Sequence, residues 1–493
     1  MFEETVLRSF LRTIETSGNE KSFYIKEEYF SYDDLARAVS KIRGAIQKEC
    51  FITGNVGLIT NDDLDTYASV FAVWLEGLAY VPISPLQPYE KNLEIASQAN
   101  LCCTLDSSGT FALPSIKTIH TKSLLFDIYS LEPSSVSDQT GAIVLFTSGS
   151  TGKPKGVSIS RGNIQAFTDA FWNLGYEINY QDRVLQAFDL TFDLSVMSFL
   201  IPLLRGACVY TVPPVQVKYC LIADLLEKFR LTVALMVPST IRYLQPFFKE
   251  MSLPYLRYCL FCGESLPLEL TQEWSKCIPN SIIDNVYGPT EATIFCTQYR
   301  YNINGLNKSH NGVLSIGKSM KNCRLIIVDE NRNEIKDGLT GELCISGGQL
   351  SSGYLNMPEK NRDVFFVDDL KERYYRTGDL CYKDPDGDIM FCGRLDTQVK
   401  VQGYRIELGE IEFHVREIVR GRNVVALCYQ GIYGNNEIAL FIEGNKVDRN
   451  SLMDQIRKRL SNYMIPNRIF FQEEFPLNSN GKTDKSALQK MIM

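Results

Sequence analysis

The N-terminal half of the chain repeats one order of segments, and this order most constrains the fold. Residues 54–60 (GNVGLIT) form a short apolar run, residues 66–77 (TYASVFAVWLEG) have the length of a helix that ends at a glycine, and residues 78–84 (LAYVPIS) form a second run before a proline. A strand, a helix and a second strand predict a parallel βαβ unit. Similar apolar runs follow at 141–146, 207–212 and 232–237. The sequence therefore predicts layered α/β sheets.

The C-terminal part has a different texture. After about residue 310, short apolar runs (CRLIIVD, GELCIS, DIMFCG) alternate with Gly, Asp and Asn turns, which predicts a β-rich subdomain. Residues 407–419 and 450–464 are typical of helices, and residues 424–429 and 437–443 of strands. We expect a large N-terminal domain, residues 1–394, and a small C-terminal α/β domain, residues 395–493.

Composition excludes several classes of protein. The 493 residues carry 51 Lys and Arg against 58 Asp and Glu, a net charge of −7, whereas a nucleic-acid binder would show a basic stripe. No apolar run reaches the roughly 18 residues of a membrane span, and the start MFEETVLRSFLRTIE lacks the order of a signal peptide. Fourteen dispersed cysteines are too few for a disulfide scaffold. We expect a cytoplasmic location, no membrane insertion and no nucleic-acid partner.

The segment 146–156 (FTSGSTGKPKG) is the strongest functional signal, and it directly follows the apolar strand at 141–146. Glycines let backbone N–H groups converge on phosphate oxygens, the hydroxyls donate hydrogen bonds, and the lysines supply positive charge. It is not a Walker A loop, because Pro154 follows Gly152 and Lys153 where a helix would have to begin. The segment predicts a different kind of phosphate-binding loop.

This loop resembles the signature of the adenylate-forming (AMP-binding) enzymes, which include acyl-CoA synthetases, luciferases and the adenylation domains of peptide synthetases. Further segments match in the family's order: 285–291 (NVYGPTE), 375–380 (YRTGDL), 393–407 (GRLDTQVKVQGYRIE) and 480–482 (NGK). The resemblance covers residues 25–490, and it implies a mobile C-terminal domain. That domain would rotate about a hinge at Asp396 and exchange Lys482 for the Gly403 loop, so that one site performs two half-reactions.

The resemblance implies a site for ATP and Mg²⁺. The expected catalytic residues are Lys482, Thr290 and Glu291, with Glu291 as the Mg²⁺ ligand and Lys482 between the substrate carboxylate and the α-phosphate. Asp379 would accept hydrogen bonds from the ribose, and Tyr287 would stack on the base. The expected ATP contacts are Thr147, Ser148, Gly149, Ser150, Thr151, Gly152, Lys155, Gly263, Glu264, Asn285, Tyr287, Gly288, Thr290, Asp379, Arg394 and Lys482.

Asp193, in the segment 188–197 (FDLTFDLSVM), indicates the substrate class. In the amino-acid-activating branch, an Asp at this position pairs with the α-ammonium of the substrate. A buried carboxylate is costly without a cationic partner, and a fatty acid would have no use for one. The alternative is that Asp193 only caps the helix that follows it.

The remaining pocket positions implied by the resemblance are apolar. They are Leu194, Met197, Met236, Leu260, Cys262, Val286, Ile294 and Phe295. Such a pocket excludes a charged side chain and disfavours a polar one, since an unpaired polar group costs roughly 1–3 kcal/mol. The set is similar to that of ligases that load D-alanine onto a carrier protein, in which a Cys at position 262 crowds the α-carbon and favours the D-isomer. D-Alanine is thus the first choice, with L-alanine, glycine, serine, proline and valine left open.

Other classes of function stay as alternatives. Residues 393–412 read more like the hinge of a peptide synthetase, so a stand-alone adenylation enzyme for another small amino acid remains possible. An acyl-CoA synthetase fits Asp193 less well, and a non-catalytic scaffold would be expected to lack Lys482, Glu291 or Asp379, which are all present. The chain continues for eleven residues after Lys482, so we expect the phosphopantetheine-bearing carrier to be a separate protein.

Overall fold

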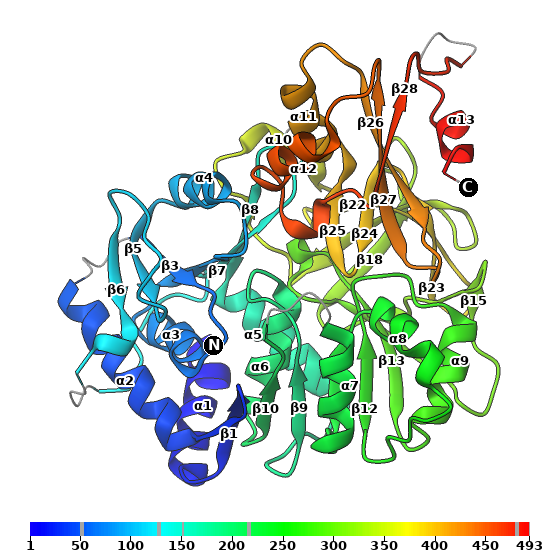
Figure 1. Cartoon of the computed structure of the whole chain (residues 1–493). Coiled ribbons are helices and arrows are strands. Elements are labelled where there is room, and N and C mark those ends of the chain that lie inside the picture. Colours follow the sequence, from blue (N-terminus) through cyan, green and yellow to red (C-terminus); the bar gives the residue numbers. More distant parts are fainter. Residues whose placement is uncertain (50–53, 126–129, 150–151, 214–217, 479–482, 493) are drawn as a thin grey trace.

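The computed structural model describes residues 1–49, 54–125, 130–149, 152–213, 218–478 and 483–492 (Figure 1). Two large sheets form the N-terminal part, a curved antiparallel sheet lies beside them, and a smaller α/β unit lies above (Figure 1). Among the described residues, no helix is long and apolar enough to cross a membrane. The α/β class predicted from the sequence is confirmed.

The first large sheet contains the predicted βαβ unit. β3 (Asn55–Ile59) pairs in parallel with β4 (Ala79–Ile83), and α3 (Leu64–Leu75) connects them. The helix ends where Gly77 takes a φ of +79°, a left-handed conformation that glycine tolerates best. The other strands are β5 (Leu101–Asp106), β6 (Lys117–His120), β7 (Gly141–Thr147), β8 (Lys155–Ser160) and β20 (Gly353–Tyr354). Because β7 and β8 are antiparallel neighbours, the phosphate-loop sequence connects two adjacent strands.

The second large sheet has a mainly parallel centre. Its strands in spatial order are β17 (Lys318–Ser319), β14 (Thr297–Arg300), β13 (Ile282–Tyr287), β12 (Tyr258–Phe261), β11 (Val233–Met236), β9 (Arg183–Gln186), β10 (Cys208–Thr211), β1 (Lys21–Ile25) and β2 (Glu28–Ser31). Side chains alternate between its two faces. Leu235 and Leu260 face the core between the two sheets, and Met236 and Phe261 face the opposite core.

Helices fill both faces of this arrangement. The core between the large sheets includes α3, α5 (Arg161–Asn173) and α6 (Asp193–Leu203), whereas α7 (Lys218–Lys228), α8 (Pro238–Leu244) and α9 (Leu268–Cys277) cover the far face of the second sheet. The remaining N-terminal helices are α1 (Arg8–Ser17), α2 (Tyr32–Glu49) and α4 (Tyr89–Ala99). The carboxyl ends of the central strands point toward the C-terminal unit (Figure 1).

The β-rich segment after residue 310 forms an antiparallel sheet, as predicted. Its strands are β18 (Cys323–Val328), β19 (Gly341–Gly347), β21 (Phe365–Val367), β22 (Arg373–Lys383) and β23 (Ile389–Arg394), and α10 (Pro358–Val364) precedes β21. A short hairpin, β15 (Ser309–His310) and β16 (Val313–Leu314), lies in the chain between β14 and β17 of the second large sheet and contacts β23.

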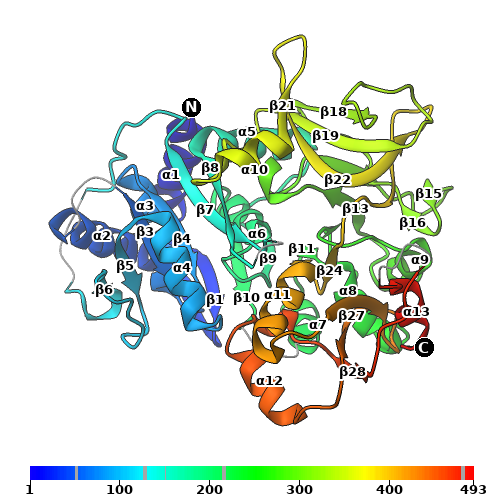
Figure 2. The same ribbon diagram turned by 90° about the horizontal axis from the view of Figure 1, so that it is seen from above.

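The C-terminal unit has its own hydrophobic core. A hairpin of β24 (Gln398–Val401) and β25 (Tyr404–Glu407), called the hinge hairpin below, leads into α11 (Leu408–Val419). These are followed by β26 (Val424–Gln430), β27 (Asn436–Glu443), α12 (Arg449–Arg457), β28 (Arg468–Gln472) and α13 (Lys485–Lys490). Figure 2, seen from above, shows α11 and β24 over the junction between the two large sheets.

One expected helix, residues 450–464, is wrong in its extent. The helix ends at Arg457, and a separate turn of 3-10 helix covers Asn462–Met464. Ser461 between them is extended, with a ψ of 150°, and breaks the helix. Leu460 and Met464 are nevertheless both buried in the same core. The helix-like spacing of apolar residues therefore shows only that one side of the segment is buried. A bent segment can bury one side as well as a straight helix can.

Candidate active site

The predicted site segments meet at the carboxyl ends of the central strands, where α/β sheets commonly bind ligands. The loops after β7, β12 and β13 surround a space of about 90 Å³, called the inner cavity. Asp193, Cys262 and Thr290 line it from below, and Gly403 and Arg405 of the hinge hairpin line it from above. Segments that are far apart in the sequence thus form one site.

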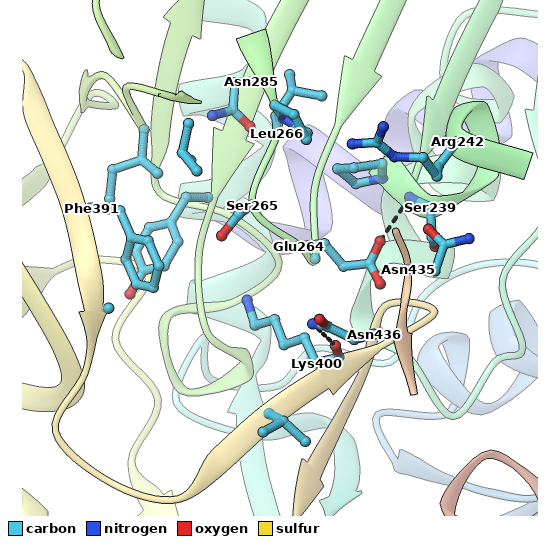
Figure 3. A pocket seen from close by; sticks show the side chains of 18 of the residues that line it. Ser239, Arg242, Glu264, Ser265, Leu266, Asn285, Phe391, Lys400, Asn435 and Asn436 are labelled. Atoms are coloured by element: carbon cyan, nitrogen blue, oxygen red, sulfur yellow. Dashed lines mark hydrogen bonds between the residues drawn. The ribbon is translucent and has the colours of Figure 1, made fainter. Parts of the chain in front are cut away.

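A larger space of about 470 Å³, called the outer cavity, adjoins the inner one (Figure 3). The predicted ATP-contact residues that line it are Gly263, Glu264, Asn285, Tyr287, Gly288, Asp379 and Arg394. Figure 3 shows Lys400 extending into this space from the hinge hairpin. The Lys400 ammonium lies 5.8 Å from the centre of the Tyr287 ring, within range of a cation–π contact. The cavity thus lies beside Tyr287, the residue expected to stack on the base.

Asp379 is a buried acceptor at the border of the two cavities. The Tyr287 hydroxyl donates to its Oδ2 at 2.5 Å, and Arg394 Nη1 donates to its Oδ1 at 2.6 Å. Arg394 also forms a two-pronged contact with Asp396, through Nε at 2.7 Å and Nη2 at 2.6 Å. The predicted ribose acceptor is therefore tied directly to the predicted hinge residue through one arginine.

Glu291 is wholly buried, and its charge is balanced by the hinge hairpin. Arg405 Nη1 lies 2.8 Å from its Oε2 and 3.1 Å from its Oε1, and the Tyr354 hydroxyl donates to Oε1 at 2.5 Å. Burial by itself would raise the pKa of Glu291, but the charge of Arg405 and the bond from Tyr354 outweigh it and lower the pKa to about 2. The residue predicted to bind Mg²⁺ thus holds an arginine in this arrangement.

The described part of the phosphate loop is also occupied by the C-terminal unit. Ser148 Oγ donates to the Arg405 carbonyl at 2.8 Å, the Gly149 N–H donates to Glu410 at 3.3 Å, and Lys155 Nζ lies 3.4 Å from Glu407. Burial lowers the pKa of Lys155, and the neighbouring Arg405 charge adds to this effect. Two carboxylates and one carbonyl of the C-terminal unit therefore contact the described groups that were predicted to bind phosphate.

Asp193 begins α6 at the floor of the inner cavity and is 7% exposed. Among the described residues, its Oδ2 atom is buried and has no hydrogen-bond partner, whereas Thr290 and the backbones of Leu194 and Ile294 interact with the carboxyl group and partly offset the effect of burial on its pKa. Burial raises the pKa of the Asp193 carboxyl to about 6. The shift from the ordinary carboxyl pKa of 3.8 means that burial disfavours the ionised form of Asp193 by about 3 kcal/mol in the free protein. Phe192, the residue before the helix, makes no side-chain cap, and the Asp193 carboxyl, which interacts with the Leu194 backbone, belongs to a side chain that lines the inner cavity.

The apolar residues predicted around Asp193 are all buried. Those that share one hydrophobic cluster are Leu194, Met197, Leu260, Cys262, Val286, Ile294 and Phe295. Met236 belongs to the opposite core and lines a third space of about 270 Å³, called the side cavity. Of the whole set, Leu194 and Cys262 line the inner cavity, and Val286 lines the outer cavity.

Some predictions lie elsewhere or outside the described residues. Ser150, Thr151 and Lys482 are outside the described ranges. Thr147 lines the inner cavity, whereas Gly152 packs against Phe413. The sequence reasoning assigned no role to Arg405 or Lys400, although both lie in the quoted hinge motif, because their contacts depend on how the hinge hairpin folds.

Similarity to known proteins identifies the class of enzyme, an ATP-dependent ligase that forms AMP. The model of the AMP-binding enzyme family matches residues 10–355, and the chain belongs to this family. It is 29% identical to a D-alanine–D-alanyl carrier protein ligase of Bacillus licheniformis, over 97% of each chain. It is also 29% identical to tyrocidine synthase 3 of Brevibacillus parabrevis, where the match covers 99% of this chain and 8% of that much longer protein.

A solved structure is similar over nearly the whole length. The adenylation domain AlmE of Vibrio cholerae, in complex with glycyl-adenosine-5'-phosphate, superposes with a TM-score of 0.87 at 27% identity, over 98% of this chain and 97% of that one. The adenylate-forming fold is therefore shown for this chain.

The Arg405–Glu291 pair predicts a specific effect on nucleotide binding. Replacing Arg405 by Met keeps most of the side chain but removes the cation, so the hinge hairpin loses its strongest charge contact with the site. In the proposed reaction, ATP binds only to molecules in which the hinge hairpin has left the site. The variant should populate this open form more, so we expect Mg·ATP to bind about tenfold more tightly. Arg457→Met, on the exposed surface of α12, is the matched control. Equilibrium binding of a fluorescent ATP analogue measures both, and unchanged or weaker binding by Arg405→Met contradicts the prediction.

Proposed function

We propose that this protein activates a small amino acid, D-alanine in the first place, as aminoacyl-AMP and then transfers it to the phosphopantetheine thiol of a separate carrier protein. The observation that carries the proposal is the buried Asp193 Oδ2, which has no hydrogen-bond partner among the described residues and belongs to a side chain that lines a small cavity. A buried carboxylate of this kind requires a cation, and the α-ammonium of an amino acid supplies one. A fatty acid or an aromatic acid offers no such group.

In the first half-reaction, a carboxylate oxygen of the amino acid attacks the α-phosphorus of ATP, and pyrophosphate leaves. Asp193 orients the substrate through its ammonium, and Thr290, at the inner cavity, is placed to bond the α-phosphate. Bound Mg²⁺ would supply positive charge to the phosphate oxygens. Glu291 fits such a ligand role, because its buried carboxylate already holds a cation in this arrangement. Lys482 is the proposed bridge between the two reacting groups.

The arrangement described above fits the second half-reaction, in which the thiol attacks the acyl carbon and AMP leaves. Gly403 lines both the inner and the side cavity, and its N–H donates to Glu264 at 2.9 Å. The side cavity, with Phe192 packed edge-on against Tyr404 at 4.6 Å, is the proposed path of the phosphopantetheine arm. The division into domains at residues 394 and 395, with Asp396 as hinge, is part of this proposal.

The small inner cavity supports a small substrate. Its free space of about 90 Å³ and its apolar surroundings suit the methyl group of alanine. One relative that matches over nearly its whole length is a ligase named for D-alanine, and one similar solved structure holds a glycyl adenylate. Similarity to tyrocidine synthase 3 keeps a stand-alone adenylation enzyme for another small apolar amino acid as the second candidate.

The function is tested by amino-acid-dependent exchange of pyrophosphate into ATP, with D-alanine, L-alanine, glycine, serine, proline and propionate. We expect D-alanine to give the highest kcat/KM and propionate to give none, because propionate has no ammonium for Asp193. Asp193→Asn should lose the preference for alanine over propionate. The loss should amount to several kcal/mol, because the substrate ammonium would be buried without a counter-charge. Preference for another small amino acid would favour the second candidate, and activity with propionate alone would refute amino-acid activation.

Cys262 provides a test of the stereochemical part. Its side chain borders the inner cavity, so its removal should make room for the methyl group of the other enantiomer. A methyl-sized discrimination is worth roughly 1–3 kcal/mol, and we expect Cys262→Ala to raise kcat/KM for L-alanine about tenfold or more with little change for D-alanine. Cys259→Ala is the matched control, since Cys259 is equally buried on β12 but faces the opposite core. An unchanged D/L ratio in Cys262→Ala would refute this role.

A further inference from the structure

The loop that carries Glu291 and Ile294 has an unusual backbone. Thr293 has a φ of +54° and Ile294 a φ of +74°, and both are β-branched residues in the left-handed region that glycine favours. Both are buried, at 0% and 1% exposure, so solvent does not relieve the conformation. Strained backbone of this kind persists only where the surroundings hold it in place, and it clusters at functional sites.

A single side chain, Gln349, supplies much of this hold. It is 1% exposed and follows β19, and its Nε2 donates to the carbonyls of Ala292 at 3.3 Å, Thr293 at 3.1 Å and Phe295 at 2.8 Å. Because an amide has two N–H groups, the three carbonyls share them. In return, Thr293 Oγ1 donates to the Gln349 carbonyl at 2.6 Å. Gln349 therefore contacts the loop on both sides of its left-handed residues.

Neighbouring groups fix the orientation of the Gln349 side chain and the position of its segment. The thiol of Cys323 donates to its Oε1 at 3.2 Å, so the amide is oriented with its nitrogen toward the loop. Two residues further on, the Ser351 N–H donates to the Glu291 carbonyl at 2.8 Å. The segment 349–351 thus holds the loop at Glu291, at its left-handed turn and at Phe295.

The position of this loop affects the inner cavity directly. The Ile294 backbone is among the groups that, against the larger effect of burial, lower the pKa of Asp193. Phe295 packs edge-on against Phe167 at 5.0 Å, and its Cα approaches Gly288 so closely that a Cβ there would lie 2.4 Å away. A small displacement of the loop would therefore change both the wall behind Cys262 and the surroundings of the Asp193 carboxylate.

We propose that Gln349 is a positioning residue that sets the size discrimination of the inner cavity by holding the Thr293–Ile294 turn. It does not line the inner or the outer cavity, so it acts through the loop and not by contact with substrate or nucleotide. The proposal rests on the proposed function in one respect only, that the inner cavity receives the reacting acid.

The experiment compares Gln349→Met, which keeps the volume but removes the amide, with the wild-type full chain in pyrophosphate exchange. The substrates are the acid that the wild type prefers and its analogue with one more methylene, such as D-alanine and D-2-aminobutyrate. Displacement of a bound reactant by about 1 Å can lower the reaction rate up to 100-fold. We therefore expect the KM for the preferred acid to rise about tenfold and the KM for ATP to stay within about twofold of the wild-type value. Discrimination against the larger analogue should fall.

Controls separate positioning from stability. Tyr32→Phe removes a buried hydrogen bond of similar length, 2.8 Å to the Ala207 carbonyl, at a distant place in the fold, and it should lower the melting temperature without changing discrimination. If Gln349→Met does not fold, Gln349→Asn, which keeps an amide but shortens it, is measured in the same way and should show the same selective rise in KM.

A Gln349 variant with a lower melting temperature but unchanged acid KM and unchanged discrimination would overturn the proposal. Because the result is a ratio of variant to wild type for whichever acid the wild type prefers, it is independent of whether that acid is D-alanine. Failure of the substrate panel and failure of this proposal are therefore distinguishable.

Discussion

Two buried carboxylates, Glu291 and Asp193, each require a cation, and this requirement governs the whole site. Glu291 has its cation in Arg405, and its pKa is accordingly low, at about 2. Among the residues that the structure describes, Asp193 has none, and burial raises its pKa to about 6. The difference between the two environments supports the two proposed roles, in which Glu291 exchanges Arg405 for Mg²⁺ and Asp193 binds the ammonium group of the substrate.

In the proposed two-step reaction, the same reasoning implies that the C-terminal unit closes on the site after the β- and γ-phosphates have left as pyrophosphate. Its hinge hairpin and α11 bring a guanidinium to Glu291 and carboxylates to Lys155 and to the Gly149 N–H. A metal-bound triphosphate would present charges of the same signs to the same groups. The closed arrangement and the bound triphosphate therefore compete, which links loss of pyrophosphate to closure in the proposed two-step reaction.

Much of the fold followed from local patterns, since apolar runs of strand length and a glycine-terminated helix specify a βαβ unit without reference to distant residues. The positions of Asp193, Cys262, Tyr287 and Asp379 around one site followed from motif order. The contacts of Arg405 did not, because they depend on how the hinge hairpin packs. Gln349 gave no signal, since a glutamine in a Gly/Ser-rich turn does not reveal that its amide faces a left-handed loop. The sequence did not reveal that α12 stops before Ser461, because apolar residues are buried on both sides of this position.

Proton release on substrate binding tests the central claim most directly. The Asp193 carboxyl is half protonated near pH 6 in the free protein, and an ammonium partner should drive it to the ionised form. Calorimetric titration with D-alanine, in buffers of different ionisation enthalpy and with an ATP analogue that cannot be cleaved, should show release of about half a proton at pH 6 and almost none at pH 8. Asp193→Asn should release none at either pH. Binding without proton release at pH 6, or equal release by Asp193→Asn, would contradict the account.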